Sequence, residues 1–199
     1  IDGSIMGTLF VDNIKHQSSQ GSGTITIGAS GEIIKAASGS TNNIGIGMAD
    51  QWRLTSSLSN PSNGYISANL ERVDDASWSK IGTGMTESSG IFSFPASGLY
   101  LVRFKSVVQK FSGAATNQYI AVSTDSGSSY NDVARTIQGE GSSSNSYNTG
   151  VSEALVNVTD ASTFRVRFEF DGLSSNAGMS GNTAYTVTGF TFIRLGDSQ

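Results

Sequence analysis

The chain has 199 residues, with 24 glycines, no cysteine, 12 basic and 16 acidic side chains, and a formal net charge of −4. This length fits one domain plus an extension, or two small domains, and the absence of cysteine excludes disulfides. The basic residues are scattered, so the chain lacks the electrostatic footprint of nucleic-acid binding. No apolar run approaches the about 20 residues that a membrane span needs, so we expect no membrane insertion.

Residues 1–47 contain short β-branched runs between glycine and serine, at 9–11, 24–27, 32–34 and 44–46. Each run is too short to bury a core in one chain, but such segments become stable where several copies wrap together in a fibre. A flexible Gly/Ser linker is the alternative. We expect a β-rich fibrous stem over 1–47. Residues 1–5, ahead of Met6, are expected to be an addition left from recombinant expression.

Residues 48–199 show recurrent period-2 alternation. In 164–170 the apolar side chains share one face, and Arg165, Arg167 and Glu169 share the other, which is typical of a strand with one buried face. Short strands with regular turn signals indicate a β-sandwich or jelly roll. The predicted strands are 51–57, 65–73, 90–94, 99–107, 118–123, 131–137, 151–158, 164–170 and 184–195.

The strand at 99–107 is apolar on both faces. Its Tyr100, Val102 and Phe104 face is expected to lie in the core. Leu99 and Leu101 then need a second buried surface, and a contact between subunits would supply it.

Residues 89–102 read SGIFSFPASGLYLV. This segment resembles the strand–Pro–x–x–Gly–x–Tyr signature of the globular heads of the first complement component, which share a jelly roll with the tumour necrosis factors. Similar but weaker matches occur at 52–54, 154–158 and 187–193, whereas the turn at 159–162 lacks the Gly-Asp that the family often has. The resemblance implies an all-β fold in which 48–199 form a jelly-roll knob and assemble as a homotrimer.

The start of the chain resembles another family. Residues 9–15, LFVDNIK, followed by 23–28, GTITIG, are similar to the opening of tail-fibre or head-fibre proteins of marine bacteriophages. This resemblance implies a virion or extracellular location and attachment to the virion through the stem.

Residues 123–130, STDSGSSY, resemble an Asp-box. The pattern predicts a hairpin turn in which the Asp125 carboxylate accepts backbone N–H groups and Gly127 takes a positive φ. A calcium loop would need further acidic residues at alternating positions. His16 is the only histidine and has no zinc-ligand partners in the sequence. We therefore expect neither a metal nor a cofactor.

Catalysis has little support in the sequence. A glycosidase needs two carboxylates, but the acidic residues stand outside any recognisable motif and are expected to be surface acids: Glu71, Asp74, Asp75, Glu140, Glu153, Glu169 and Asp171. Trp52 and Trp78 are expected to anchor the core or a trimer interface, with a sugar-stacking platform as the alternative.

Connections between antiparallel strands alternate between the two ends of the sandwich. Linkers 108–117, 138–150 and 171–183 therefore share one end, and the short linkers 124–130 and 159–163 share the other with the C-terminus and the stem. Long loops on a rigid scaffold commonly bind ligands, and amide and tyrosine side chains suit carbohydrate hydroxyls. The candidate receptor contacts are Lys110, Asn117, Glu140, Asn145, Tyr147, Asn148, Asn176 and Asn182.

Three functions follow as hypotheses. The first is a trimeric bacteriophage fibre whose knob binds a host-surface receptor, a glycan or a protein. The second is a capsid decoration or head-fibre module with a structural role only, and the third is a short glycan hydrolase. Specific adsorption to cells separates the first from the second, and cleavage that depends on one acidic pair would support the third.

Overall fold

The computed structural model describes residues 46–59, 61–110, 115–139, 146–173 and 177–199, and within these ranges it contains strands and no helix. All but the last two residues of the predicted stem lie outside the described residues, as does His16. The described fold is therefore that of the predicted knob.

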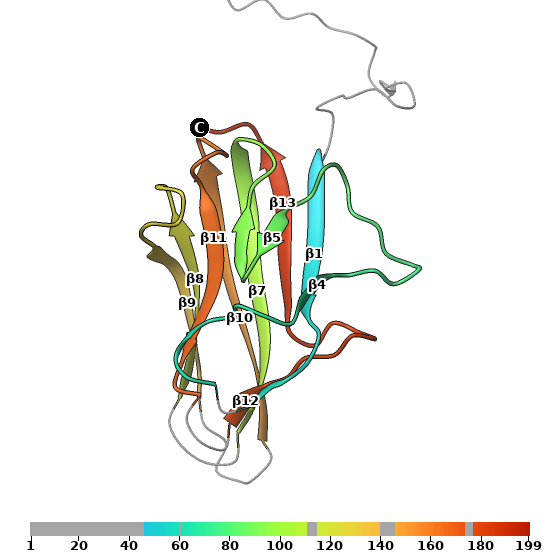
Figure 1. Cartoon of the computed structure of the whole chain (residues 1–199), viewed down its shortest axis with the longest axis vertical. Coiled ribbons are helices and arrows are strands. Elements are labelled where there is room, and N and C mark those ends of the chain that lie inside the picture. The colour runs from blue at the N-terminus through green and yellow to red at the C-terminus, as the bar shows by residue number, and fades with distance from the viewer. Residues whose placement is uncertain (1–45, 60, 111–114, 140–145, 174–176) are drawn as a thin grey trace, which may run out of the picture. The chain divides into compact units, whose positions relative to one another are not determined.

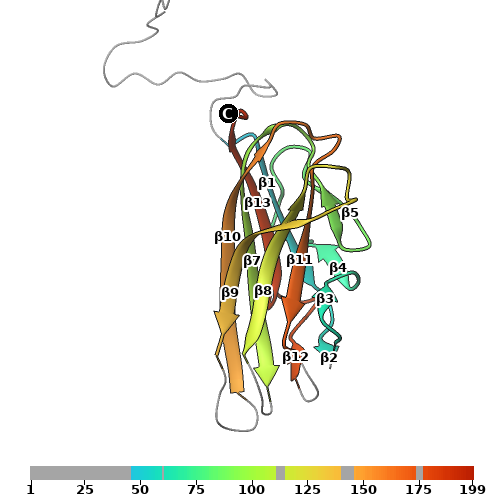
Figure 2. The same cartoon turned by 90° about the vertical axis from the view of Figure 1, so that its left-hand side faces the viewer.

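Two antiparallel sheets face each other (Figures 1 and 2). The seven strands of the first, sheet A, are β1 (Met48–Leu54), β2 (Leu58–Ser59), β4 (Leu70–Arg72), β7 (Gly98–Lys110), β10 (Ser146–Val158), β12 (Ala177–Met179) and β13 (Gly189–Gly196). The six strands of the second, sheet B, are β3 (Gly64–Tyr65), β5 (Thr86–Ser88), β6 (Ile91–Ser93), β8 (Thr116–Ser123), β9 (Asn131–Gln138) and β11 (Arg165–Asp171). The all-β jelly-roll prediction is confirmed.

Aromatic rings from both sheets fill the space between them. Phe168 of β11 lies 4.4 Å from Phe190 of β13 between ring centroids, and Phe92 of β6 lies 5.1 Å from Phe192. Phe104 of β7 stacks on Phe190 at 5.3 Å. These rings are almost fully buried, and their tilted and offset arrangements are those that aromatic quadrupoles favour. The alternation in 164–170 therefore identified the core face of β11 correctly.

Four predicted strands differ clearly from the observed ones. Those predicted at 51–57 and 151–158 are observed at Met48–Leu54 and Ser146–Val158. The strand predicted at 65–73 is split into β3 and β4, with Asn69 at a left-handed φ of 61° just before β4. The strand predicted at 184–195 begins at Gly189, because residues 180–188 leave the sheet between β12 and β13. Strands β2, β5 and β12 have two or three residues each and were not predicted, since so short a run carries no periodic signal.

The connections divide between the two ends as predicted, but their predicted difference in length is wrong. Strands β7, β8, β10 and β12 extend into the predicted long linkers, which leaves connections 111–115, 139–145 and 172–176, about as long as 124–130 and 159–164 at the other end. The β7–β8, β9–β10 and β11–β12 connections share what we call the distal end, because the residues that flank them are paired in register: Ser146 and Ala177 with Lys110, Thr116 with Gln138, and Asp171 with Asn117. At the proximal end Met48 pairs with Arg194, and Val158 with Gly98. Strand β1 thus starts beside the C-terminal strand, opposite the distal end (Figure 1).

The 180–188 loop is tied to sheet A at both of its ends. The Ser180 amide donates to the Val107 carbonyl at 2.8 Å, and the Asn182 amide donates to the Leu54 carbonyl at 2.9 Å. At the other end the Thr188 carbonyl accepts from the Leu54 amide at 3.0 Å, and the buried Thr188 hydroxyl accepts from the Val107 amide at 3.1 Å. The loop therefore replaces the ladder hydrogen bonds that β7 and β1 would otherwise lose.

The Asp-box forms the predicted hairpin turn between β8 and β9. The Asp125 carboxylate accepts from the Ser129 amide at 3.0 Å and from the Ser129 hydroxyl at 2.6 Å, and Gly127 has a φ of 92°. The Tyr130 ring lies under the Arg167 guanidinium, 3.8 Å from its central carbon. Hydrogen bonds from Ser129 and Ser123 lower the pKa of Asp125 to about 2.

Candidate functional site

A hydrogen-bonded cluster of polar side chains lies on the outer face of sheet B at its distal end. Asp171 of β11 accepts from the Asn117 amide and, at 2.8 Å, from the Tyr119 hydroxyl. The Asn117 oxygen in turn accepts from the Arg135 guanidinium at 2.6 Å, and that guanidinium lies 5.5 Å from the Tyr119 ring centre. Four side chains from three strands thus hold one another in place, which reduces the entropy that a bound partner would have to remove.

A second polar group lies directly beneath, between the sheets. The Gln118 side chain is fully buried; its amide donates to the Phe104 carbonyl at 3.0 Å and to the Ser152 hydroxyl at 3.1 Å. Its oxygen accepts from Ser106 and, at 2.9 Å, from Gln138. Gly150 makes room for this network, since a Cβ there would lie 2.6 Å from the Gln138 amide nitrogen. The distal half of the core is therefore held by hydrogen bonds as well as by apolar packing.

The structure places five of the eight predicted receptor contacts. Lys110 ends β7, Asn117 lies in β8, and Tyr147 and Asn148 lie near the start of β10, so these four share the distal end. Glu140, Asn145 and Asn176 lie outside the described residues. Asn182 does not join the others, because it lies in the 180–188 loop against Leu54 rather than in the β11–β12 connection.

Among the predicted contacts whose side chains the structure describes, Tyr147 is the most available to a partner. Its side chain is 61% exposed and stands on the outer face of sheet A. The Asn148 amide is fixed by donating to the Gly139 carbonyl at 2.9 Å. Asn117 was a predicted receptor contact, but Tyr119, Arg135 and Asp171 were not, because they become neighbours of Asn117 only through strand pairing. The one available signal was that alternation places these residues on the outward face of their strands.

The outer face of sheet A carries an apolar row across four strands. Ala49 of β1 pairs with Ile193 of β13, Ile193 with Leu101 of β7, and Leu101 with Leu155 of β10. Leu155 is 64% exposed. Trp78 is half-buried beside this row and lines a pocket of about 200 Å³ together with Ile193. Leu101 thus faces outward in this row, and the subunit contact predicted to bury Leu99 and Leu101 stays a prediction.

Trp52 belongs to the core instead. Its ring packs edge-on against Phe92 at 5.4 Å, and its indole N–H donates to buried Asp50 at 3.0 Å. Arg72 covers the ring at 4.7 Å and also binds Asp50. A sugar-stacking role for Trp52 is thereby excluded.

The carboxylates considered for glycan hydrolysis are engaged in ion pairs and hydrogen bonds. Buried Arg53 binds three of them at once, with N–O distances of 2.6 Å to Glu71, 2.7 Å to Asp74 and 2.9 Å to Asp75. Three other described residues belong to the set considered for hydrolysis. Glu153 pairs with Arg103, Glu169 pairs with Arg167, and Asp171 lies in the distal cluster. Within the described residues no group of three acidic or histidine side chains could hold a metal ion.

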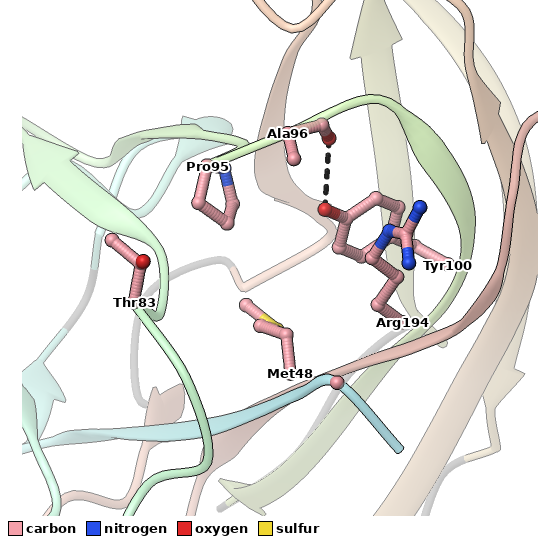
Figure 3. Close-up of a pocket in the computed structure, with 7 residues that line it drawn as sticks. Met48, Thr83, Pro95, Ala96, Tyr100 and Arg194 are labelled. Carbon is pink, nitrogen blue, oxygen red and sulfur yellow. Dashed lines mark hydrogen bonds between the residues drawn. The ribbon is translucent and has the colours of Figure 1, made fainter. Parts of the chain in front are cut away.

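A pocket of about 290 Å³ opens at the proximal end (Figure 3). Met48, Thr83 and Pro95 line one side, and Tyr100 and Arg194 the other. The Tyr100 hydroxyl donates to the Ala96 carbonyl at 2.8 Å, and burial raises the pKa of Tyr100. The Arg194 guanidinium is occupied by the Ser97 carbonyl at 3.0 Å and by Asp197 at 2.7 Å. Because the Tyr100 hydroxyl and two of the three Arg194 nitrogens are already paired, this pocket offers a ligand few free polar groups.

The order of strands in the two sheets, with β4-β1-β13-β7-β10 facing β5-β6-β11-β8-β9, defines a jelly roll of the tumour-necrosis-factor type. Two solved structures with this fold are Eiger TNF from S. frugiperda, at 12% identity over 76% of this chain and 94% of that chain with a TM-score of 0.58, and murine APRIL at pH 8.0, at 13% identity over 74% and 98% with a TM-score of 0.53. No family model matches the chain, and no curated protein matches it significantly.

At such identities the likeness establishes the fold alone. In the described part of the chain, no helix is long and apolar enough to cross a membrane.

Proposed function

We propose that the chain is a homotrimeric fibre protein of a bacteriophage virion, which attaches to the particle through its N-terminal stem and binds a host-surface receptor, a glycan in our preferred form, through the distal end of its knob. In this proposal the protein is extracellular and binds without catalysis. The bacteriophage origin and the attachment through the stem rest on the fibre-like sequence of the N-terminus, and the binding role rests on the geometry of the knob.

The observation that carries the binding role is the position of the distal end. The β7–β8, β9–β10 and β11–β12 connections meet there, opposite the end at which β1 begins, so a knob held by its N-terminus would present them outward. Exposed Tyr147 and the ordered cluster around Asn117 lie at this end. Tyrosine, arginine and amide groups held in place by neighbours are the types that dominate recognition surfaces.

The apolar row on sheet A supports assembly. A strongly exposed leucine continuous with Leu101 and Ile193 is costly in a monomer and stabilising when covered by another subunit. A closed ring of three copies would bring three distal ends into one surface. Weak contacts made together gain about 10²–10⁴ in avidity.

A glycan array probed with labelled full-length protein tests the binding role. We expect a defined set of glycans to be bound, and Tyr147→Ala together with Asn117→Ala to reduce the signal at least tenfold. Tyr185→Ala is the matched control, because Tyr185 is also 61% exposed but lies in the 180–188 loop. Absence of binding to both glycans and host cells would leave only a structural role.

A further inference from the structure

A second pocket, of about 450 Å³, lies on the outer face of sheet A. Its floor is formed by β1, β13, β7 and β10, and Thr186 of the 180–188 loop forms a wall. The volume falls in the range of about 300–1,000 Å³ that is usual for small-molecule sites. All of the lining comes from one chain: Gln51, Arg103, Lys105, Thr149, Val151, Thr186, Gly189 and Thr191.

The wall of this pocket is preformed. Two residues beyond Thr186, Thr188 is anchored to both β1 and β7 by the hydrogen bonds described above. Gly189 allows the loop to come close, because a Cβ at this position would lie 2.5 Å from the Thr186 methyl carbon. The pocket therefore needs little rearrangement to receive a ligand.

The charge of the lining is positive and only partly compensated. Lys105 has no hydrogen-bond or ion-pair partner among the described residues, and no carboxylate lines the pocket. Arg103 is half exposed and pairs through its Nε with Glu153 at 3.2 Å, which leaves its terminal nitrogens for another acceptor. Lys105 and Arg103 stand on the same face of β7, two residues apart, so one anionic group can reach both.

The rest of the lining suits a hydroxylated ring. Hydroxyls of Thr149, Thr186 and Thr191 and the amide of Gln51 offer donors and acceptors that no described side chain occupies. Val151 supplies an apolar contact for ring carbons. A bare inorganic anion would use the cations only, and a neutral sugar would use the hydroxyls only.

We propose that this pocket binds an acidic monosaccharide unit, with its carboxylate on Lys105 and Arg103 and its hydroxyls on the three threonines. The site is separate from the Asn117 cluster, which lies on the outer face of sheet B. All of its lining comes from one chain, and it occupies the outward-facing row next to the apolar row, so in the proposed trimer it would open beside the subunit contact.

The test is a ligand-observed NMR titration of full-length protein with D-glucuronate, with D-glucose as the neutral match and sulfate as the bare anion. We expect saturable binding of glucuronate, at least tenfold weaker binding of glucose, and weak competition by sulfate. Lys105→Gln should weaken glucuronate binding at least tenfold. Lys80→Gln should leave it unchanged, because Lys80 is exposed in the segment before β5 and bonds only to the Gly82 carbonyl.

Three results would overturn the proposal: no saturable glucuronate binding, an unchanged affinity in Lys105→Gln, or sulfate binding as tightly as glucuronate. Far-ultraviolet circular dichroism of each variant checks that it is folded. Asn117→Ala should leave glucuronate binding intact, because Asn117 faces outward from sheet B. Failure of this site and failure of the distal-end proposal therefore give different results.

Discussion

At the scale of single residues, the most unusual side chain is Arg53. It is 2% exposed on the outer face of β1, yet it faces three carboxylates on and beyond β4. A buried cation needs such partners, because desolvation without pairing is costly. One guanidinium thereby fixes the segment that follows β4 against the sheet.

Replacing this side chain should be strongly destabilising. We expect Arg53→Met to lower the free energy of unfolding by about 3 kcal/mol, the lower end of the range for breaking a buried pair, since solvent reaches all three carboxylates. Urea denaturation measures this. Arg103→Met, which removes a half-exposed pair, should cost less than about 1 kcal/mol, and equal costs for the two variants would contradict the role given to Arg53.

Asp125 should make stability depend on acid pH. Because its pKa is lowered to about 2 from 3.8, its contribution is present above pH 4 and is lost as the pH falls toward 2. Asp125→Asn should therefore be less stable than the natural chain at neutral pH, and the gap should narrow between pH 4 and pH 2. Urea midpoints across this range measure the gap, and a constant gap would show that the carboxylate charge is unimportant in this turn.

At the scale of strands, what the sequence revealed depended on whether the signal was local. Alternation in 164–170 predicted β11, and the apolar run at 99–107 predicted β7, because one face of each strand is buried along most of its length. The break between β12 and β13 was missed because it depends on Thr188 bonding to Val107 and Leu54, both distant in sequence. The pocket lined by Lys105 and Thr186 was missed for the same reason. The shared distal position of Asn117, Tyr147 and Asn148, by contrast, followed from the alternating direction of successive antiparallel strands.

Strand β8 offers a test of the two polar groups that it separates. Gln118 points into the core and Asn117 points outward. Gln118→Ala should lower the free energy of unfolding by about 1–3 kcal/mol, because buried partners in β7, β9 and β10 lose hydrogen bonds. Asn117→Ala should cost under about 1 kcal/mol. Thermal and urea denaturation of both variants check this, and the reverse order would contradict the assignment of faces.

At the scale of the whole molecule, the apolar row on sheet A is the surface that the proposed trimer would bury. We expect light scattering of the full chain to give three times 20.8 kDa. Leu155→Arg should reduce this to 20.8 kDa, because a charge would enter the centre of the subunit contact. Ser88→Arg adds the same charge to exposed β5 on the opposite sheet and should leave the mass unchanged. A monomeric natural chain would refute the trimer.

The start of β1 beside β13 has a mechanical consequence. In the proposed fibre, a pull applied through Met48 would run along β1, which is paired over six positions with β13 and over three with β4. Ladder hydrogen bonds lie perpendicular to the strands, so such a load shears the whole ladder at once instead of opening it pair by pair. In the proposed fibre, a knob loaded between its stem and its distal end would therefore resist unfolding.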